Sequence, residues 1–312
     1  MKAGLRGAIL VRLHMQALRS ALVALTAYPF GLAATACATE IHEIAVAGGE
    51  IVSIAIAPGG NGIAAGVEGL GKDADNPLSE VRWWNWNGTE GRQRRKDNSA
   101  PHALAWDRDG TLLAGGWALA LRIPTLWWRR LGPGGAVIAE CRAAPPHNDS
   151  VRAAPHGIVS IAPLPGGKVV TGGNDSTLAV WEGCKPLWLQ SGMCCVGDRD
   201  VTVAARGDGF ITFGEGGWQN DELGYKQLGP RQWLPSPWRA APAEPRAQKP
   251  GLHADGESCS ATLDAEGRLI VNGASSWTAR FGKDTWERLA VARDCSAAAA
   301  ATENRIVWGQ SP

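Results

Sequence analysis

Seven charged or imidazole side chains stand just before segments of small residues that have the composition of strands. They are Asp149, His156, Asp198, Arg199, Asp255, Glu257 and Asp294. If such carboxylates lie close together in the folded chain, they can hold a calcium ion or bind a basic partner. The alternative is a solvated polar rim, since charged loop residues are usually exposed. We treat the seven as candidate binding residues and predict no catalytic residue among them.

The familiar signatures of enzyme and metal chemistry are absent from this sequence. It has no His-Glu-x-x-His pair, no paired Cys-x-x-Cys and no Cys-x-x-Cys-His haem site. Gly-x-Ser-x-Gly elbows and phosphate loops are absent as well. Asp107-Arg108-Asp109-Gly110 resembles the start of a calcium loop, but the ligands that should follow are missing. We interpret it as a hairpin turn and predict neither a metal nor a cofactor.

Residues 1–38 have the features of an export signal. Four basic residues and no acidic one precede an apolar stretch that ends in Ala36-Cys37-Ala38, a small-x-small cleavage pattern. Met15 is an alternative start that would leave a compact signal, and a buried amphipathic helix is the alternative structure. The stretch is short and contains Pro29, so we predict no transmembrane span. We expect a periplasmic or secreted protein. The lesser alternative is an envelope lipoprotein anchored through Cys37, because residues 32–37 resemble a lipoprotein box.

Removal of this leader would change the net charge from +1 to −3 and leave six of the seven cysteines. Disulfides are plausible in an oxidising compartment, but the sequence leaves their pairing open. The six are Cys141, Cys184, Cys194, Cys195, Cys259 and Cys295. Cys259 and Cys295 begin equivalent strands of neighbouring units and are candidates for each other. The adjacent Cys194 and Cys195 could instead form a vicinal disulfide or a soft-metal site.

A mildly acidic chain without a sustained basic face is a poor nucleic-acid binder, so we expect no nucleic-acid partner. Its one basic run, residues 92–96, is interpreted as a solvated loop, with a phosphate or lipid-headgroup contact as the alternative.

The elements that would position the candidate residues come from a repeat. A small-residue strand, a turn rich in Gly or Asp, and a short apolar strand recur six times, at spacings of 37 to 58 residues. The turns are 58–60, 108–110, 165–167, 207–209, 265–267 and 302–304. Each unit has the chemistry of a β-hairpin, and a four-stranded propeller blade needs about 40–45 residues. The repeat therefore predicts an all-β chain: a single β-propeller of about six four-stranded blades, with seven as the alternative.

The small-residue strands before the turns are expected to be the innermost strands of the blades, where bulky side chains do not fit. Most of the 15 tryptophans are expected to wedge between blades rather than form stacking surfaces. Residues 41–47 form a spare strand that should pair with a short last blade and close the ring. The propeller would span residues 39–312, with long loops at 71–100 and 232–257.

One unit resembles a complete WD40 repeat. It runs from His156 through the Pro165-Gly166-Gly167 turn to Trp181-Glu182, the pair that stands where the WD40 family has Trp-Asp. By this resemblance, four residues would form the hydrogen-bonded network that stiffens a blade: His156, Thr171, Asp175 and Trp181. His156 as a metal ligand or base is the alternative. The other five units lack the complete network, so the resemblance is specific over about one blade.

The resemblance implies a protein-interaction or scaffold module that binds a protein or peptide on the propeller face. We expect a monomer without catalytic activity. The alternative is a six-bladed hydrolase or lyase that uses a metal in its channel, similar to lactonase-type propellers. That activity would need several carboxylate or amide ligands to converge on the axis, and strands of Ser, Ala and Val do not supply them.

Overall fold

The computed structural model describes residues 36–37, 40–69, 79–85, 90–95, 100–120, 123–143, 157–173, 177–190, 201–214, 217–221, 224–228, 231–235, 238–242, 252–274 and 276–311. The regular structure in these ranges is almost entirely β-strand, and all of it belongs to the unit formed by residues 36–312. The exceptions are three short 3-10 helices at Pro58–Gly60, Pro133–Gly135 and Pro165–Gly167. None of the described elements is a helix with the length and apolarity needed to cross a bilayer.

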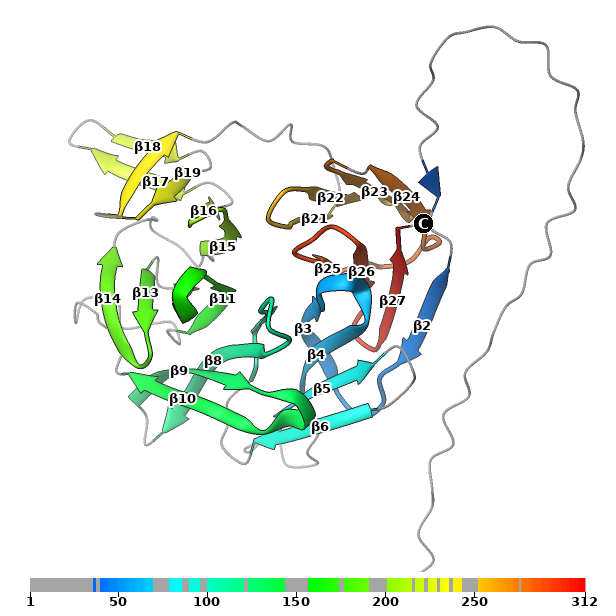
Figure 1. The fold of residues 1–312 in the computed structure, drawn as a ribbon, viewed down its shortest axis with the longest axis horizontal. Coiled ribbons are helices and arrows are strands. Elements are labelled where there is room, and N and C mark those ends of the chain that lie inside the picture. Colours follow the sequence, from blue (N-terminus) through cyan, green and yellow to red (C-terminus); the bar gives the residue numbers. More distant parts are fainter. Residues whose placement is uncertain are drawn as a thin grey trace, which may run out of the picture. The chain divides into compact units, whose positions relative to one another are not determined.

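Six sheets, called blades 1 to 6, are arranged around a common centre (Figure 1). Blade 1 contains β3 (Glu50–Ile56), β4 (Gly62–Glu68), β5 (Ser79–Asn85) and β6 (Glu90–Arg95). Blade 2 contains β7 (Ala103–Trp106), β8 (Leu112–Ala120), β9 (Ile123–Leu131) and β10 (Val137–Ala143). Blade 3 contains β11 (Ile158–Pro163), β12 (Val169–Gly173), β13 (Leu178–Glu182) and β14 (Lys185–Gln190).

Blades 4 and 5 each contain an additional element. Blade 4 contains β15 (Val201–Arg206), β16 (Gly209–Gly214), β19 (Arg231–Leu234) and β20 (Arg239–Pro242), and the separate hairpin β17 (Gly217–Asp221) and β18 (Gly224–Leu228) is inserted after β16. Blade 5 contains β21 (Leu252–Asp255), β22 (Ser260–Leu263), β23 (Arg268–Asn272) and β24 (Trp277–Arg280), with β1 (Ala36–Cys37) pairing in parallel with β24. Blade 6 contains β25 (Arg288–Val291), β26 (Ala297–Ala301), β27 (Arg305–Gln310) and β2 (Ile41–Ala45).

Apart from β1, the strands of each blade pair in antiparallel fashion, and β3, β7, β11, β15, β21 or β25 lies nearest the centre (Figure 1). Among these innermost strands, contacts join β3 to β7, β7 to β11, β11 to β15, β21 to β25 and β25 to β3. The arrangement confirms the predicted six-bladed all-β propeller.

The strand from the N-terminal side closes the ring, as predicted. β2 pairs with β27 in antiparallel register, from Ile41 opposite Gly309 to Ala45 opposite Arg305. The guanidinium of Arg82, which is buried in blade 1, donates to the carbonyl of Ala47 over 3.0 Å and fixes the chain after β2. The last blade was expected to be short but has four strands, because β25 precedes the unit that the repeat identified.

The repeated hairpin occupies different positions in different blades. In blades 1 to 4 it joins the first and second strands, whereas in blades 5 and 6 it joins the second and third. The expectation that every small-residue strand is innermost is therefore wrong for the last two units. The small side chains of β26 have a different cause, because all five alanines from Ala297 to Ala301 are fully buried between neighbouring blades.

Two innermost strands share the sequence Ile-Val-Ser-Ile-Ala and use its serine alike. Ser53 in β3 donates to the carbonyl of Pro101 over 2.5 Å, at the edge of blade 2. Ser160 in β11 accepts a hydrogen bond from the Val203 amide over 2.9 Å, in blade 4. A bulge interrupts the ladder just before each serine. Each serine thus bonds the backbone of the next blade and fixes two blades together.

Tryptophans fill the space between blades, as predicted. Trp84, Trp181 and Trp233 lie on the third strands of blades 1, 3 and 4, and each is at most 6% exposed within a core cluster shared with the preceding blade. The segment 71–100, expected to be a long loop, contributes β5 and β6. The proline-rich segment 232–257 contains most of β19 and all of β20 and β21. The expected leader lies almost wholly outside the described residues.

Candidate functional site

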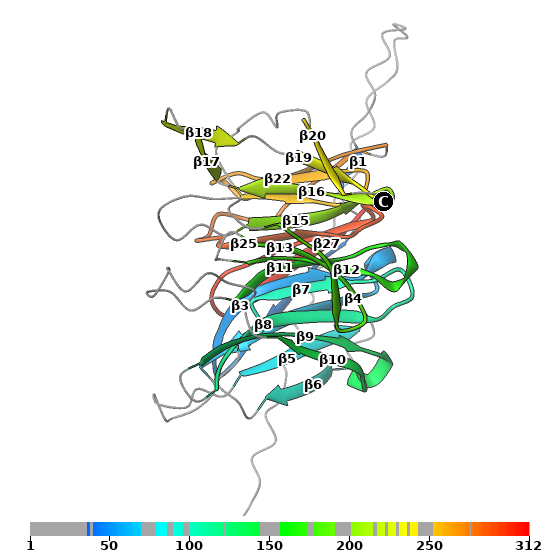
Figure 2. The same cartoon turned by 90° about the vertical axis from the view of Figure 1, so that its left-hand side faces the viewer.

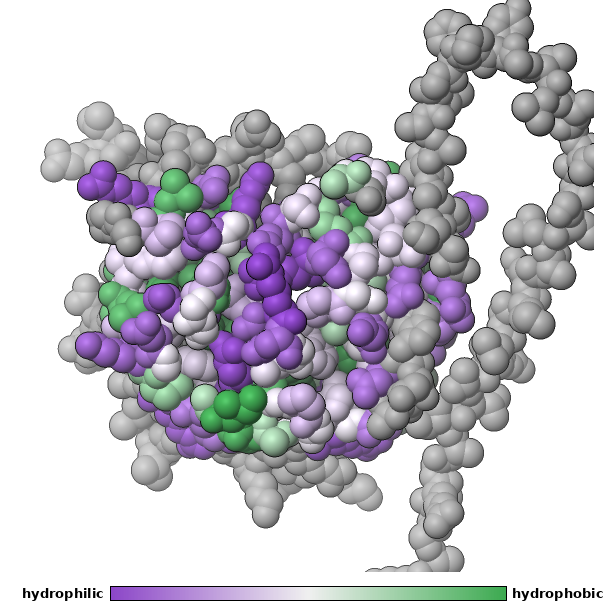
Figure 3. Space-filling view, viewed as in Figure 1, coloured by the Kyte–Doolittle hydropathy of each residue, from purple (hydrophilic) through white to green (hydrophobic). Residues whose placement is uncertain are grey.

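The turns that join first and second strands gather on one face of the ring, which we call the inner-turn face. In blades 2, 5 and 6 these turns are residues 107–111, 256–259 and 292–296. The C-terminal end of β27 lies on the same side, whereas the β17–β18 hairpin lies on the opposite side (Figure 2). Strongly hydrophilic side chains cover the centre of this face (Figure 3).

A cluster of ion pairs crosses the middle of the inner-turn face. Both carboxylate oxygens of Glu257 in blade 5 lie 2.5 Å from a guanidinium nitrogen of Arg108 in blade 2. Blades 2 and 5 are opposite each other in a ring of six, so this pair spans the centre. Arg293 of blade 6 donates to Glu257 over 2.8 Å and lies 3.7 Å from Asp107 of blade 2. We call Asp107, Arg108, Arg130, Glu257 and Arg293 the central ion cluster.

Arg130 extends the cluster to blade 3. Its guanidinium donates to Asp107 over 3.0 Å and to the carbonyl of Gly167 over 3.3 Å. Asp109 shapes the neighbouring turn by accepting hydrogen bonds from the backbone amide and the hydroxyl of Thr111, at 2.9 and 2.6 Å. The predicted hairpin turn at 107–110 is confirmed. The Asp109 carboxylate accepts hydrogen bonds within the turn, and the Asp107 carboxylate pairs with Arg130 and Arg293.

Asp294 connects blade 6 to blade 1 at the same face. Its carboxylate accepts from the backbone amide of Gly59 over 2.6 Å and from the hydroxyl of Ser296 over 2.7 Å. Gly59 has φ of +73°, a left-handed conformation that glycine adopts without steric cost, and this lets its amide face Asp294. Gln310 adds a second link by donating to the carbonyl of Gly60 over 3.0 Å.

The electrostatics favour the ionised forms of Glu257 and Arg108. Burial alone would raise the pKa of Glu257, but hydrogen bonds from Arg108 and Arg293 outweigh it and lower the pKa below the ordinary value. The same bond to Glu257 raises the pKa of Arg108. Arg108 is the exposed member, with 66% of its side chain accessible against 19% for Glu257 and 11% for Arg293. A partner at the centre of this face would therefore meet Arg108 first.

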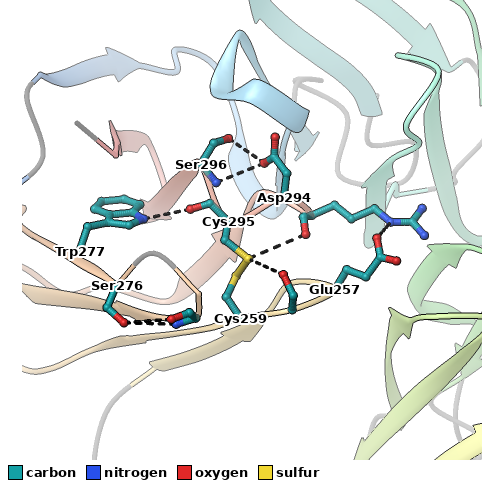
Figure 4. Close-up of a disulfide and its surroundings, with 10 residues drawn as sticks. Glu257, Cys259, Ser276, Trp277, Asp294, Cys295 and Ser296 are labelled. Atoms are coloured by element: carbon teal, nitrogen blue, oxygen red, sulfur yellow. Dashed lines mark hydrogen bonds and ion pairs between the residues drawn. A yellow bond between two sulfur atoms is a disulfide. The ribbon is translucent and has the colours of Figure 1, made fainter. Parts of the chain in front are cut away.

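Two disulfides join neighbouring blades. Cys259 pairs with Cys295 between blades 5 and 6, which confirms the candidate pairing, and Glu257 and Asp294 lie beside this bond (Figure 4). Cys141 pairs with Cys184 between blades 2 and 3. Cys194 and Cys195 lie outside the described residues.

Three of the seven predicted binding residues are described by the structure. Glu257 and Asp294 lie in turns of the inner-turn face, and Asp255 ends β21 immediately before one of them. They follow the innermost strands instead of preceding them, because the repeat in the last two blades is displaced by one strand. Asp149, His156, Asp198 and Arg199 lie outside the described residues.

Two of the four residues expected to form the WD40-type blade network lie within the described ranges. In blade 3 the indole of Trp181 donates to the hydroxyl of Thr171 over 2.9 Å, while His156 and Asp175 lie outside the described residues. Blade 4 contains a second such pair that sequence reasoning missed, with the Trp233 indole 3.1 Å from the hydroxyl of Thr212. In both blades the threonine stands two residues beyond the residue that pairs with the tryptophan.

Within the described ranges, no three His, Cys, Asp or Glu side chains are grouped so that they could hold a metal ion. The carboxylates of the central ion cluster face guanidinium groups, and that of Asp294 faces backbone and hydroxyl donors. Carboxylates bonded in this way act in ion pairs and turn caps rather than as ligands of a cation.

Neither a protein-family model nor a curated protein matches the chain. Among solved structures, the chain in "Crystal structure of RRP9 WD40 repeats" is similar over 89% of this chain and 99% of that chain, with 11% identity and a TM-score of 0.55. A chain of "Crystal Structure of Mitotic Checkpoint Complex" covers 96% of this chain and 100% of its own length, with 11% identity and a TM-score of 0.48. At this identity the likeness concerns the fold, which is that of a WD40-like β-propeller.

Proposed function

We propose that this chain is an exported, monomeric interaction module that binds a protein or peptide on its inner-turn face. The observation that carries the proposal is the central ion cluster, in which side chains from opposed blades meet at the hydrophilic centre of this face (Figure 3). Such a cluster offers charged groups held in fixed positions by a rigid scaffold, a common basis of specific recognition.

The hydrogen bonds of the carboxylates on the inner-turn face favour binding over metal-dependent catalysis. A hydrolase or lyase with a metal near the ring centre would need several carboxylate or amide oxygens converging on one point. Here Glu257 is bonded to two arginines, and Asp294 is bonded to Gly59 and Ser296. Elemental analysis of the purified protein distinguishes the two functions, since one tightly held calcium ion per chain would support the metal-dependent alternative.

Export rests on the leader-like residues 1–38 and on the cysteines. Two disulfides are compatible with a periplasmic or extracellular protein, because thiols are kept reduced in most cytosols. Cleavage after Ala38 would remove β1 and leave the closing strand β2 in place.

The proposal is tested by affinity capture from envelope extract with two matched variants. Arg108→Ala removes the exposed arginine of the central ion cluster. Arg268→Ala removes an equally exposed arginine, 63% accessible, that bonds Asp264 over 2.7 Å at the β22–β23 turn on the other face. A partner retained by the wild type and by Arg268→Ala, but about tenfold less by Arg108→Ala, supports the proposal. Equal retention by both variants contradicts it.

A further inference from the structure

The disulfide between Cys259 and Cys295 lies where the central ion cluster is anchored. Cys259 ends the turn that carries Glu257, and Cys295 belongs to the turn that carries Arg293 and Asp294 (Figure 4). The two turns also meet through the backbone, because the Glu257 amide donates to the carbonyl of Arg293 over 3.1 Å. A change in the position of either cysteine would therefore also move Glu257 and Arg293, two members of the central ion cluster.

The backbone at Cys295 is held in an unfavourable conformation. With φ of +67°, Cys295 is the only non-glycine residue of the described chain in the left-handed region, which L-residues avoid for steric reasons. Its amide donates to Ala292 over 2.8 Å and its carbonyl accepts from the Trp277 indole over 2.9 Å. The covalent bond to Cys259 adds to these restraints. Without it, fewer interactions hold Cys295 in the left-handed conformation.

The surroundings can accommodate a free thiol at Cys295. The Ser258 hydroxyl lies 3.5 Å from its sulfur, and the carbonyl of Arg293 lies 3.9 Å away. A reduced Cys295 could therefore donate to that carbonyl and accept from Ser258, so partners for its thiol are already in place. Cys259 is half-buried whereas Cys295 is buried, so Cys259 is the more exposed residue of the pair.

We propose that Cys259–Cys295 is a redox-sensitive clasp that orders the central ion cluster. With the disulfide formed, Glu257 is held against Arg293 and reaches Arg108 across the ring. With the disulfide reduced, the two turns separate more readily and the cluster loses its fixed geometry. The link to partner binding rests on the proposed function, whereas the link to the order of the turns does not.

The redox step is ordinary thiol–disulfide exchange with a dithiol reductant. One thiolate of the reductant attacks the sulfur of Cys259, and the Cys295 thiolate leaves and takes up a proton. The second thiolate of the reductant then attacks the mixed disulfide and releases Cys259. The protein gains two thiols, and the reductant departs as its cyclic disulfide.

The clasp is tested by hydrogen exchange on the full chain with two matched double variants. C259S/C295S removes the disulfide at the inner-turn face, and C141S/C184S removes the other disulfide between neighbouring blades. The reporters are the amides of Gly59 and Glu257, which bond Asp294 and Arg293. The references are the amides of Leu164 and Gly267, which bond within the turns of blades 3 and 5.

We expect the reporter amides to exchange at least about tenfold faster in C259S/C295S, with the reference amides unchanged and C141S/C184S like the wild type. Unchanged reporters overturn the proposal. Faster exchange of reporters and references together also overturns it, because that result indicates general destabilisation. Treating C141S/C184S with a dithiol provides a second route to the reduced bond and should accelerate the same reporter amides.

Partner capture then separates the two proposals. If the clasp exists and the inner-turn face binds, C259S/C295S should retain less partner than C141S/C184S. If the reporter amides accelerate while capture is unchanged, the clasp stands and the proposed binding face is wrong.

Discussion

The hydrogen bond between Trp181 and Thr171 offers a clear test of how the blades are stiffened. Thr171→Val replaces the hydroxyl by a methyl group of nearly the same shape, so it removes the acceptor with little change in packing. Thr171 and Trp181 are 3% and 2% exposed, which leaves the indole N–H with no access to water. The variant therefore isolates the cost of an unpaired buried donor.

The expected cost follows from that burial. Leaving a buried donor unpaired costs about 1–3 kcal/mol, and the apolar methyl group offsets part of it, so we expect a loss of about 1–2 kcal/mol in the free energy of unfolding. For a chain of this size each kcal/mol shifts Tm by about 2–4 °C, which predicts a decrease of about 2–8 °C. Thr212→Val should behave alike, because it removes the acceptor of Trp233.

Urea unfolding followed by tryptophan fluorescence and circular dichroism measures this loss. A double-mutant cycle with Trp181→Phe isolates the pairwise part, expected at about 1 kcal/mol. Thr285→Val, at an exposed position, is the control and should change stability by less than about 0.5 kcal/mol. A loss below about 0.3 kcal/mol in both Thr171→Val and Thr212→Val would refute the role assigned to these pairs.

Three further predictions concern the joints between blades and the central ion cluster. Gly66→Ala would force a methyl carbon against the Pro101 carbonyl and the Ser53 hydroxyl, so urea unfolding should show a loss of about 2 kcal/mol or more. A stability equal to that of the wild type would contradict the packing described. Ser160→Ala leaves the Val203 amide without its acceptor and should cost about 1–2 kcal/mol, whereas an unchanged midpoint would contradict the bond between blades 3 and 4. Because the pKa of Glu257 is lowered on folding, its ionised form stabilises the chain above the ordinary pKa of about 4.3, and this stabilisation is lost as pH falls through the lowered value. Unfolding of Glu257→Gln between about pH 5 and pH 3 should therefore depend less on pH than in the wild type, and an equal pH dependence would contradict the ion pairs.

The sequence predicted the architecture because the blades repeat local chemistry. Gly-rich turns between short apolar strands favour hairpins, and hairpins spaced by about one blade length are typical of a propeller. The Ile-Val-Ser-Ile-Ala strands of blades 1 and 3 show the repeat most directly, since both serines bond the backbone of the next blade. Closure by β2 followed from the unpaired strand that precedes the first unit.

The position of the hairpin within each blade was not predictable from the same pattern. A tight turn flanked by small residues can connect either the first and second strands of a blade or the second and third strands. In blades 5 and 6 the true first strands are Leu252–Asp255 and Arg288–Val291, which lack the small-residue signature. The Trp233–Thr212 pair escaped notice for a related reason: the β17–β18 hairpin separates its members by 21 residues, compared with 10 for Trp181 and Thr171.

The candidate site was predictable only in part. Glu257 and Asp294 stood out because acidic residues flank small strands, but the two arginines that pair with Glu257 did not. Arg108 and Glu257 are 149 residues apart, and only the ring topology brings opposed blades together. Arg293 is adjacent to Asp294, and an arginine next to a candidate carboxylate is the one local signal that could have indicated an ion pair.

Hydrogen-exchange footprinting of the captured complex tests the central claim most directly. The account predicts that a bound partner protects the turns at 107–111, 256–259 and 292–296, which carry most of the central ion cluster. The turn at 264–267, on the opposite face, should exchange as in the free protein. Protection confined to that opposite face or to the outer strands, with the three inner turns unchanged, would contradict the account.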